Sequence, residues 1–428
     1  MDKFSTPEYE RSRRAYVVQE TVNYLISLLI ADVFLAKLLS NIGISDGLVG
    51  IISSFISLAF VVQLLSFFLA RAKTSSKKLV IVFDTLGILF FMCMYLVPFI
   101  PCSKTIKSVI LMVCILIGYV FKYLVQNILF RWANSYVIPT KRASFSAVKE
   151  MLSLFSGMFF SIAIGYIIDR FEIRDNLNGG FLFIALSIFI LNVCNFISLM
   201  LIKVESPQTK RLKTAEPVWS VLRNLVGNKK YRNIIILTSM WEIARYFTIG
   251  FMGIFKSKDL MMSVSLVQLI NVISCLSRML ISKSIGYYAD KNSYAKGFKL
   301  GLYFAAGAFL INMFTTKATW FLVIIFTILY NCSLAGTNSS SFNMIYSYVD
   351  SEYITQALSL KNCIGGLLGF GASIIGGELL DVIQAGNNMI FDIHIYGQQV
   401  LSGISFVITV TTIIFITKVV EKQKVFVQ

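Results

Sequence analysis

The chain has 428 residues, of which 56% are hydrophobic and 14% charged, and its formal net charge is +17. About a quarter of the residues of soluble domains are charged, so this composition excludes an ordinary soluble protein. The longest polar stretch, 203–230, is too short to fold around a core of its own. Long apolar runs separated by short basic stretches predict an all-α integral membrane protein instead.

Twelve apolar stretches of membrane-spanning length follow one another along the chain. They lie at 17–40, 47–70, 79–101, 108–137, 143–169, 179–202, 232–256, 262–288, 297–315, 319–349, 355–383 and 394–418. Lys and Arg are concentrated before the first stretch, in alternate connections and after the last stretch. Because basic residues mark the cytoplasmic side of membrane proteins, we expect a multi-pass protein of the cell membrane with cytoplasmic tails at 1–16 and 419–428. The positive charge then reflects topology in the lipid bilayer and predicts no nucleic-acid partner.

Three further features narrow the chemistry. Basic residues precede the first stretch without a small-residue cleavage pattern, so we expect this stretch to stay as an anchor. The seven cysteines form no CxxC pair, and the single histidine, His394, begins the last stretch; we therefore expect no metal site and no cofactor. The sequence has no Walker A motif, which excludes an ATP-driven pump within this chain.

An internal repeat relates the two halves of the sequence. A shift of 212 residues gives nine identities over residues 135–169, more than composition alone would produce. The residues that recur 212 positions later are Ser135, Tyr136, Val137, Lys149, Gly157, Ser161, Ile162, Gly165 and Asp169. The repeat predicts two pseudo-symmetric six-helix halves, 17–202 and 231–418, joined by a cytoplasmic linker at 203–230.

The linker contains the segment VWSVLRNLVG, in which Val218, Leu222 and Leu225 share one face of a helix. Basic residues lie beside this face. The pattern predicts an interfacial amphipathic helix in the cytoplasmic headgroup layer. A structural linker is favoured over a regulatory one.

With twelve spans in two halves, the chain resembles the major facilitator superfamily. The family's cytoplasmic motif, a Gly, three residues, an Asp and basic residues, is present after the eighth span as GYYADKNSYAKG, with Gly286 and Asp290. After the second span, FFLARAKTSSKK has Phe67 and Arg71 where the family has Gly and Asp. The Gly-Pro signature of drug antiporters is absent from the fifth span. The chain is thus similar to a bacterial member whose subgroup the motifs do not indicate, and the resemblance implies alternating access.

The seventh span carries an acid and a base near its centre, Glu242 and Arg245. Ten Ile, Leu and Phe lie between residues 233 and 255, each contributing roughly −0.3 to −0.6 kcal/mol to insertion, against about +5 to +7 kcal/mol for the two charges together. Because these sums nearly cancel, the charges must face protein or water. Residues at i and i+3 can pair on one helix face, so a structural ion pair and a substrate or proton site are both open.

Other polar residues recur deep within particular spans. In chain order they are Asp32 in the first span, Lys122 and Gln126 in the fourth, Asn271 and Arg278 in the eighth, and Asn331 and Asn338 in the tenth. In the superfamily that the chain resembles, spans one, four, seven and ten line a central cavity, and spans three, six, nine and twelve, which here carry no charge at their centres, face outward. We therefore expect these residues, with the seventh-span pair, to line a substrate and ion cavity. Asp32 is the best single candidate for a proton-titrating carboxylate, whereas Arg278 fits an interhelical salt bridge equally well.

A second group of residues is expected to form a gate or cytoplasmic latch. It comprises Asp290, Lys291, Arg142, Lys149 and Lys361. The resemblance implies that Asp290 contacts the opposite half near Arg142. Lys149 and Lys361 match in the repeat, near the cytoplasmic ends of their spans. The glycine-rich segment 365–377 permits close helix packing, and a moving interface and tight static packing are both open.

Together these features predict a secondary active transporter for a small organic solute, coupled to protons, and not an enzyme. The expected cavity carries a net positive charge, which favours an anionic or zwitterionic substrate. A transport-inactive sensor or scaffold is the alternative that the missing first-half motif supports. A lipid-modifying membrane enzyme is a weaker one, because the loops lack clustered carboxylates. We expect the chain to act as a monomer.

Overall fold

The structure is a computed structural model that describes residues 6–62, 77–137, 142–203, 218–349, 353–390 and 393–423. Its contacts divide the chain into two compact units. The first comprises Met1–Ile44, Leu65–Ala215 and Ser263–Gln268; the second comprises Ser45–Leu64, Glu216–Met262 and Leu269–Gln428. Most of the second span therefore packs with the second unit, and the start of the eighth packs with the first. The division into halves at the linker 203–230 stays a prediction.

The all-α prediction is confirmed, apart from one short hairpin. In the first unit the helices are α1 (Pro7–Leu29), α2 (Asp32–Ile42), α6 (Lys77–Leu96), the 3₁₀ turn η2 (Val97–Phe99), α7 (Lys104–Ser135), α8 (Arg142–Ile173) and α9 (Leu177–Leu201). The second unit contains α3 (Asp46–Ser53), α4 (Phe55–Ala59), α10 (Val218–Gly227), α11 (Lys229–Tyr246), α12 (Ile249–Ile254), the π-turn η4 (Phe255–Asp259), most of α13 (Val264–Lys291), α14 (Tyr294–Asn312), α15 (Leu322–Tyr348), α16 (Ile354–Ala385), β1 (Met389–Ile390), β2 (Ile393–His394), α17 (Gly397–Phe415) and the π-turn η5 (Ile416–Val420).

Helices lie in each of the twelve predicted spans, and positions 63–70 of the second span fall outside the part of the chain that the structure describes. Within the described residues, nine helical segments are long and apolar enough to cross a membrane by themselves, and α1 with α2 forms a tenth that bends by 42°. The second span contains α3 and α4, and the ninth contains the 19-residue α14. The chain is therefore a multi-pass membrane protein.

Polar residues start several of these helices. Side chains of Ser45, Ser103, Asn176, Asn228 and Ser293 accept hydrogen bonds from backbone N–H groups of the following turn. The first N–H groups of a helix have no partner within it, so these caps fix where each span begins. The linker helix α10 forms where the amphipathic segment predicted one, and its place in the headgroup layer stays a prediction.

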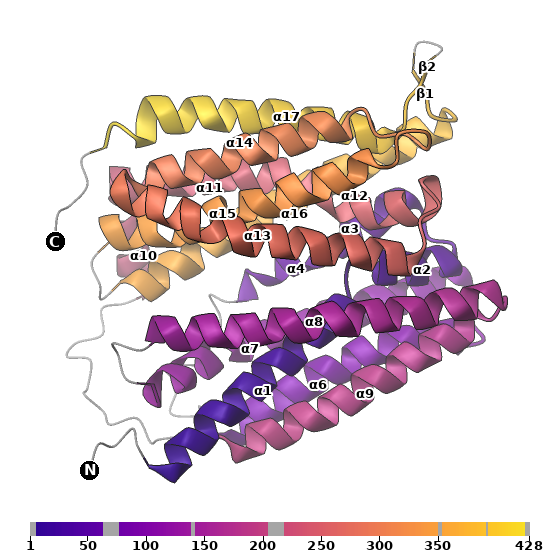
Figure 1. Ribbon diagram of the computed structural model, residues 1–428, viewed down its shortest axis with the longest axis horizontal. Helices are drawn as coiled ribbons and strands as arrows, with labels where there is room; N and C mark the ends of the chain where they lie inside the picture. The colour runs from indigo at the N-terminus through magenta and orange to yellow at the C-terminus, as the bar shows by residue number, and fades with distance from the viewer. Residues whose placement is uncertain are drawn as a thin grey trace. The chain divides into compact units, whose positions relative to one another are not determined.

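In the first unit, the long helices pack pairwise around an apolar core. Helix α6 packs against α7 and α9, while α1 packs against α8 and α9 (Figure 1). Buried aromatic residues such as Tyr16, Trp132 and Tyr136 form part of one core cluster. The fully buried Phe91 lies edge-on to Tyr119 at 5.0 Å.

The second unit has a similar arrangement. Helix α14 packs against α15 and α17, and α16 packs against α11, α3 and α4. The β1–β2 hairpin extends beyond the helices α16 and α17 that it connects (Figure 1). The prediction that His394 begins the last span was wrong in detail, because His394 lies in this hairpin and α17 begins at Gly397.

The internal repeat reappears as two helices of equal length. Helix α8 runs over Arg142–Ile173 and α16 over Ile354–Ala385, 32 residues each. Both limits of α16 lie 212 positions after those of α8. Lys149 and Lys361, and Asp169 and Asp381, therefore occupy equivalent positions on the two helices.

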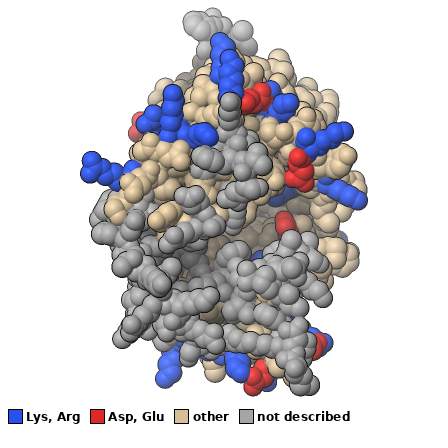
Figure 2. All heavy atoms as spheres, turned by 90° about the vertical axis from the view of Figure 1, so that its left-hand side faces the viewer, with Lys and Arg blue, Asp and Glu red and all other residues tan. Residues whose placement is uncertain are grey.

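Most of the charged side chains that Figure 2 shows are basic. Figure 2 looks onto the side on which α10 lies in Figure 1, and there Lys and Arg outnumber Asp and Glu among the described residues. This agrees with the sequence-based expectation that the connection carrying α10 is cytoplasmic. The orientation of the termini stays a prediction.

Candidate functional site

A small polar pocket, partly open to solvent, lies within the second unit. Its walls come from α11, α15, α16 and the end of α4. The lining residues are Phe60, Thr238, Trp241, Glu242, Thr337, Asn338, Ser341, Lys361, Asn362, Gly365 and Gly366. Two of the predicted cavity residues, Glu242 and Asn338, contribute to it.

The Glu242 and Arg245 side chains pair with each other on α11. The Arg245 guanidinium donates to both Glu242 carboxylate oxygens, at 3.2 and 3.4 Å. Arg245 also interacts electrostatically with Tyr330 of α15 and lies over the Tyr246 ring, 4.9 Å from its centroid. The Arg245 side chain is 25% exposed and the Glu242 side chain is 22% exposed. The ion pair that the sequence left open is thus formed, with the carboxylate at the pocket wall.

Lys361 lies in this pocket, although its sequence position suggested a gate. Its ammonium donates to the Ser341 hydroxyl at 3.1 Å, and its electrostatic neighbours are Glu242 and Arg245. Lys361 sits in the second turn of α16, which packs against α11 and α15. Packing therefore turns this lysine inward, toward a carboxylate of a neighbouring span.

Two glycines of the predicted glycine-rich segment allow close packing at the wall of the pocket. A Cβ added at Gly365 would lie 3.2 Å from a side-chain carbon of Glu242, and one at Gly366 would lie 2.3 Å from the Ser57 carbonyl oxygen. A methyl group therefore cannot fit at Gly366 without moving the backbone. The close packing that the segment 365–377 predicted is present on this face of α16.

The remaining cavity candidates of the second unit lie on α13 and α15. The Asn331 side chain donates to the Ser274 hydroxyl and to the Thr327 carbonyl, both at 3.0 Å, which ties α15 to α13. Arg278 interacts electrostatically with Tyr330. The Asn271 carbonyl accepts a hydrogen bond from Ser274. None of these three residues is among the residues that line the pocket.

In the first unit, Lys122 lies near two carboxylates. One is Glu20 of α1 and the other is Asp84 of α6, and Lys122 interacts electrostatically with both. Glu20 also forms an ion pair with Lys149 at 2.8 Å. Gln126 is exposed one turn further along α7. Lys149, expected at the gate, thus has a first-span carboxylate as its partner.

Asp84 is a buried carboxylate that sequence reasoning missed. Only 2% of it is exposed, and the Asn195 amide of α9 donates to it at 2.6 Å. Asn195 in turn accepts from Asn23 of α1. Spans three and six carry no charge at their centres, as the sequence indicated, yet they bury this polar contact nearer their ends. The Asn192 and Asn195 pair on α9 was the available signal, because asparagine is rarely buried without a hydrogen-bonding reason.

Asp32 lies at the break in the first span. It begins α2, and its φ of 48° is in the left-handed region. A non-glycine residue in that region costs roughly 1–3 kcal/mol, and such residues cluster at functional sites. Broken membrane helices likewise mark binding sites in transporters. The residue chosen from sequence as a proton-titrating carboxylate therefore has a strained backbone at a helix break.

The predicted cytoplasmic latch is only partly described. Asp290 and Lys291 are exposed at the end of α13, and Asp290 interacts electrostatically with Tyr294. The Arg142 side chain lies outside the described residues, so its contact with Asp290 stays a prediction. The same holds for a common cavity shared by the residues of both units.

Two aspartates at equivalent positions of the repeat cap other helices. Asp169 of α8 accepts from the backbone N–H groups of Val264 and Ser265 at 2.7 and 2.9 Å, where α13 begins. Asp381 of α16 accepts from the Gly47 N–H and the Ser45 hydroxyl, both at 2.9 Å, where α3 begins. A carboxylate at a helix N-terminus is stabilised by the unpaired N–H groups and the helix dipole. We call these two contacts the aspartate clamps.

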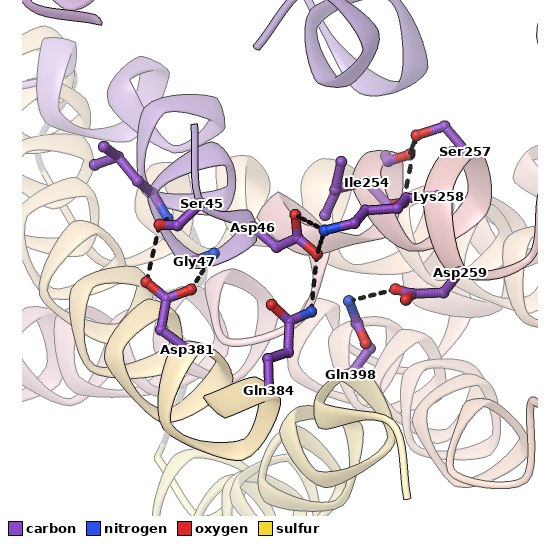
Figure 3. A network of polar contacts seen from close by, with 12 residues as sticks. Ser45, Asp46, Gly47, Ile254, Ser257, Lys258, Asp259, Asp381, Gln384 and Gln398 are labelled. Carbon is purple, nitrogen blue, oxygen red and sulfur yellow. Dashed lines mark hydrogen bonds and ion pairs between the residues drawn. The ribbon is translucent and has the colours of Figure 1, made fainter. Parts of the chain in front are cut away.

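A second set of polar contacts lies beside the Asp381 clamp (Figure 3). Asp46, only 2% exposed, accepts from the Lys258 ammonium at 2.8 and 2.9 Å and from the Gln384 amide at 2.8 Å. Asp259 accepts from Gln398 at 3.1 Å. The start of α3 is thereby tied to η4 and to the end of α16.

The comparisons with known proteins point to one family. The sequence model of the Major Facilitator Superfamily matches residues 18–385, which is most of the chain. No curated protein matches the chain.

Several solved transporters have a similar fold. A mutant of the nucleoside transporter NupG is 13% identical, with a TM-score of 0.72 over 95% of this chain and 98% of that one. A D-xylose–proton symporter is 12% identical, with a TM-score of 0.72 over 97% and 99%. The peptide transporter POT in complex with sulfate is 13% identical, with a TM-score of 0.64 over 95% and 93%. At these identities the likeness shows the fold alone.

Proposed function

Because the chain belongs to the Major Facilitator Superfamily, we propose that it is a secondary active transporter that moves a small organic solute across the cell membrane by alternating access, coupled to protons. The family makes it a transporter and not an enzyme. The observation that carries the proposal is the pocket of the second unit, which places Glu242, Lys361 and Asn338 among apolar membrane helices. Charges at this depth cost several kcal/mol unless they are paired or functional, so a polar pocket here is a candidate solute site.

The aspartate clamps support alternating access. The repeat assigns α3 to the first half and α13 to the second. The start of α3 is nevertheless capped by Asp381 of α16 in the second half, and the start of α13 by Asp169 of α8 in the first half. Such a pair of symmetric, polar contacts can open without exposing a large apolar surface. In the proposed orientation the clamps lie at the outer ends of the spans and hold that side closed. The latch residues Asp290, Lys291 and Arg142 would act on the cytoplasmic side, and the halves 17–202 and 231–418 would move as a monomer.

Proton coupling is assigned to the first unit. Asp32 has a strained backbone at a helix break, and Lys122 is flanked by Glu20 and Asp84. A carboxylate that exchanges a lysine partner for a proton couples protonation to the conformation that holds the lysine. We propose Asp32 as the proton-binding residue because of its place at the helix break, with Lys122 and Gln126 on the path.

The test is solute-dependent proton flux in proteoliposomes that contain a pH-sensitive dye. The probes are monocarboxylates, amino acids, dipeptides, nucleosides and pentoses, with a Na⁺ gradient as the competing driving force. The wild type is compared with Asp32→Asn, Lys122→Ala and Glu242→Gln. We expect flux with one class of solute and its loss in each variant. Absence of flux with every class would support the sensor or scaffold alternative, and unchanged flux in all three variants would refute the assigned site.

A further inference from the structure

Among the described residues, the charged side chains that line or adjoin the pocket of the second unit carry one positive charge more than negative charges. Three charged side chains contribute to it or adjoin it: Glu242, Arg245 and Lys361. The two-residue pair on α11 is electrically complete, because Arg245 contacts both oxygens of Glu242. Arg245 is held there by Tyr330 and by the Tyr246 ring. The charge left over is that of Lys361.

Lys361 is also short of acceptors. An ammonium group has three N–H donors, and within the described part of the chain its one hydrogen-bond partner is the Ser341 hydroxyl, at 3.1 Å. Its electrostatic neighbours include both Glu242 and Arg245, whose effects oppose each other. Lys361 is half-buried, and a cation withdrawn from bulk water with unused donors is unfavourable unless an anion or water completes it.

A second unused donor lines the same pocket. The Trp241 side chain is 2% exposed, and among the described residues its indole N–H has no acceptor. Buried indole N–H groups ordinarily find a partner. Trp241 precedes Glu242 on α11, and both line the pocket with Lys361. Lys361 and Trp241, both in the lining of this pocket, therefore have unused donors.

The lining also has an apolar side. Phe60 and Trp241 supply aromatic surface, and Gly365 and Gly366 leave the backbone of α16 without side chains. A solute with a flat or apolar body can contact these groups while a charged end meets the lysine. A dianion such as phosphate would need a second unpaired cation, which the described lining does not contain.

We propose that Lys361 and Trp241 bind the carboxylate of a small organic acid, and that the transported solute is a monocarboxylate with an aromatic or apolar body. Lys361 supplies the charge, Ser341 orients the ammonium, and the Trp241 N–H donates to a carboxylate oxygen. This inference rests on the proposed transport function, since it names the solute class of the same pocket.

The test measures binding and does not require transport. Purified full-length protein in detergent is titrated calorimetrically with a panel of monocarboxylates, including benzoate and nicotinate, each beside its neutral amide. Inorganic phosphate serves as the anion without an organic body. The variants are Lys361→Gln, Lys361→Arg and Trp241→Phe, which keeps the ring and removes the N–H. Lys317→Gln, an exposed lysine, is the matched control, and melting curves verify that each variant is folded.

We expect at least one acid to bind more than about tenfold tighter than its amide, and phosphate not to bind. Lys361→Gln should weaken that acid about tenfold or more, since a charge-assisted contact is lost. Lys361→Arg and Trp241→Phe should cause smaller losses, and Lys317→Gln none. Equal binding of acids and amides, no acid binding, or full binding by a folded Lys361→Gln variant would each overturn the proposal. Acid binding without flux would instead contradict the transport function, whereas flux of a neutral solute by Lys361→Gln would overturn only this inference.

Discussion

Replacing one carboxylate oxygen of the Asp381 clamp should shift the equilibrium between the clamped and the opened state of the protein. In Asp381→Asn, a neutral amide replaces a carboxylate that accepts from Gly47 and Ser45. Hydrogen bonds to charged groups contribute about 1.5–3 kcal/mol and neutral ones about 0.5–1.5 kcal/mol. The clamped state should therefore lose about 1–2 kcal/mol, which is a factor of about 5–30 in its population relative to the opened state. Because Asp169 holds a repeat-related clamp, Asp169→Asn should act in the same direction.

The assay is the rate of alkylation of a cysteine introduced into α3, the helix whose start Asp381 caps. Val49 of α3 is fully buried, and α3 packs on α16 and α12. Val49→Cys, in a chain whose seven native cysteines are replaced, should react slowly with a membrane-impermeant maleimide. Asp381→Asn should raise this rate by about 5- to 30-fold, in proportion to the opened population. Asp175→Asn is the matched control, because Asp175 is exposed in a turn.

Two results would refute this reasoning. Val49→Cys could react equally fast with and without Asp381→Asn, in which case the clamp does not contribute to closure. Alternatively, Asp175→Asn could raise the rate as much as Asp381→Asn, in which case the effect is a general destabilisation. A melting curve of each variant separates opening from global unfolding.

Three further substitutions test other parts of the structure. Glu242→Gln leaves Arg245 without its counter-charge and should lower the free energy of unfolding by about 2–3 kcal/mol, less than for a fully buried pair. Denaturation in micelles should show that a double variant, which also lacks Arg245, regains part of this stability. A double variant less stable than the single one would contradict the pairing. Asp32→Gly should relieve the left-handed backbone and raise stability by about 0.5–1 kcal/mol while abolishing proton-coupled flux; retained coupling would exclude Asp32 as the proton-binding residue. Gly366→Ala would place a methyl 2.3 Å from a backbone oxygen of α4 and should cost about 1–3 kcal/mol, whereas Gly371→Ala on the same helix meets open space and should be neutral; equal melting temperatures would show that α16 does not pack as described.

The spans and their repeat could be predicted well because they follow from local rules. A bilayer requires about twenty apolar residues for each helix, so hydropathy located the helices without knowledge of the fold. The 212-residue shift was equally local, and α8 and α16 reproduce it at both ends. The same reasoning required Glu242 and Arg245 to find partners, because the apolar residues of their span cannot offset both charges.

Residue-level assignment failed where it depended on which helix packs beside which. Lys361 lies near one end of its span, so its sequence position indicated a gate, yet packing of α16 against α11 and α15 turns it into the pocket. Asp84 lay in a span expected to face outward, and only the approach of α9 supplies the Asn195 amide that makes its burial tolerable. Aspartates 169 and 381 were visible as a repeat but had no evident role, because the helix starts that they cap are distant in sequence.

The amino-acid sequence by itself thus determined that this protein lies in a lipid bilayer. It also determined the number and order of the spans and the twofold repeat. Each of these depends on composition and on spacing along one helix. Tertiary structure alone decided which charges are neutralised. The Arg245 charge is cancelled by a neighbour on its own helix, which spacing could suggest, whereas the Lys361 charge is left unbalanced by the arrangement of three helices. Electrostatic balance depends on distances of a few ångströms, and those distances exist only once the helices have packed.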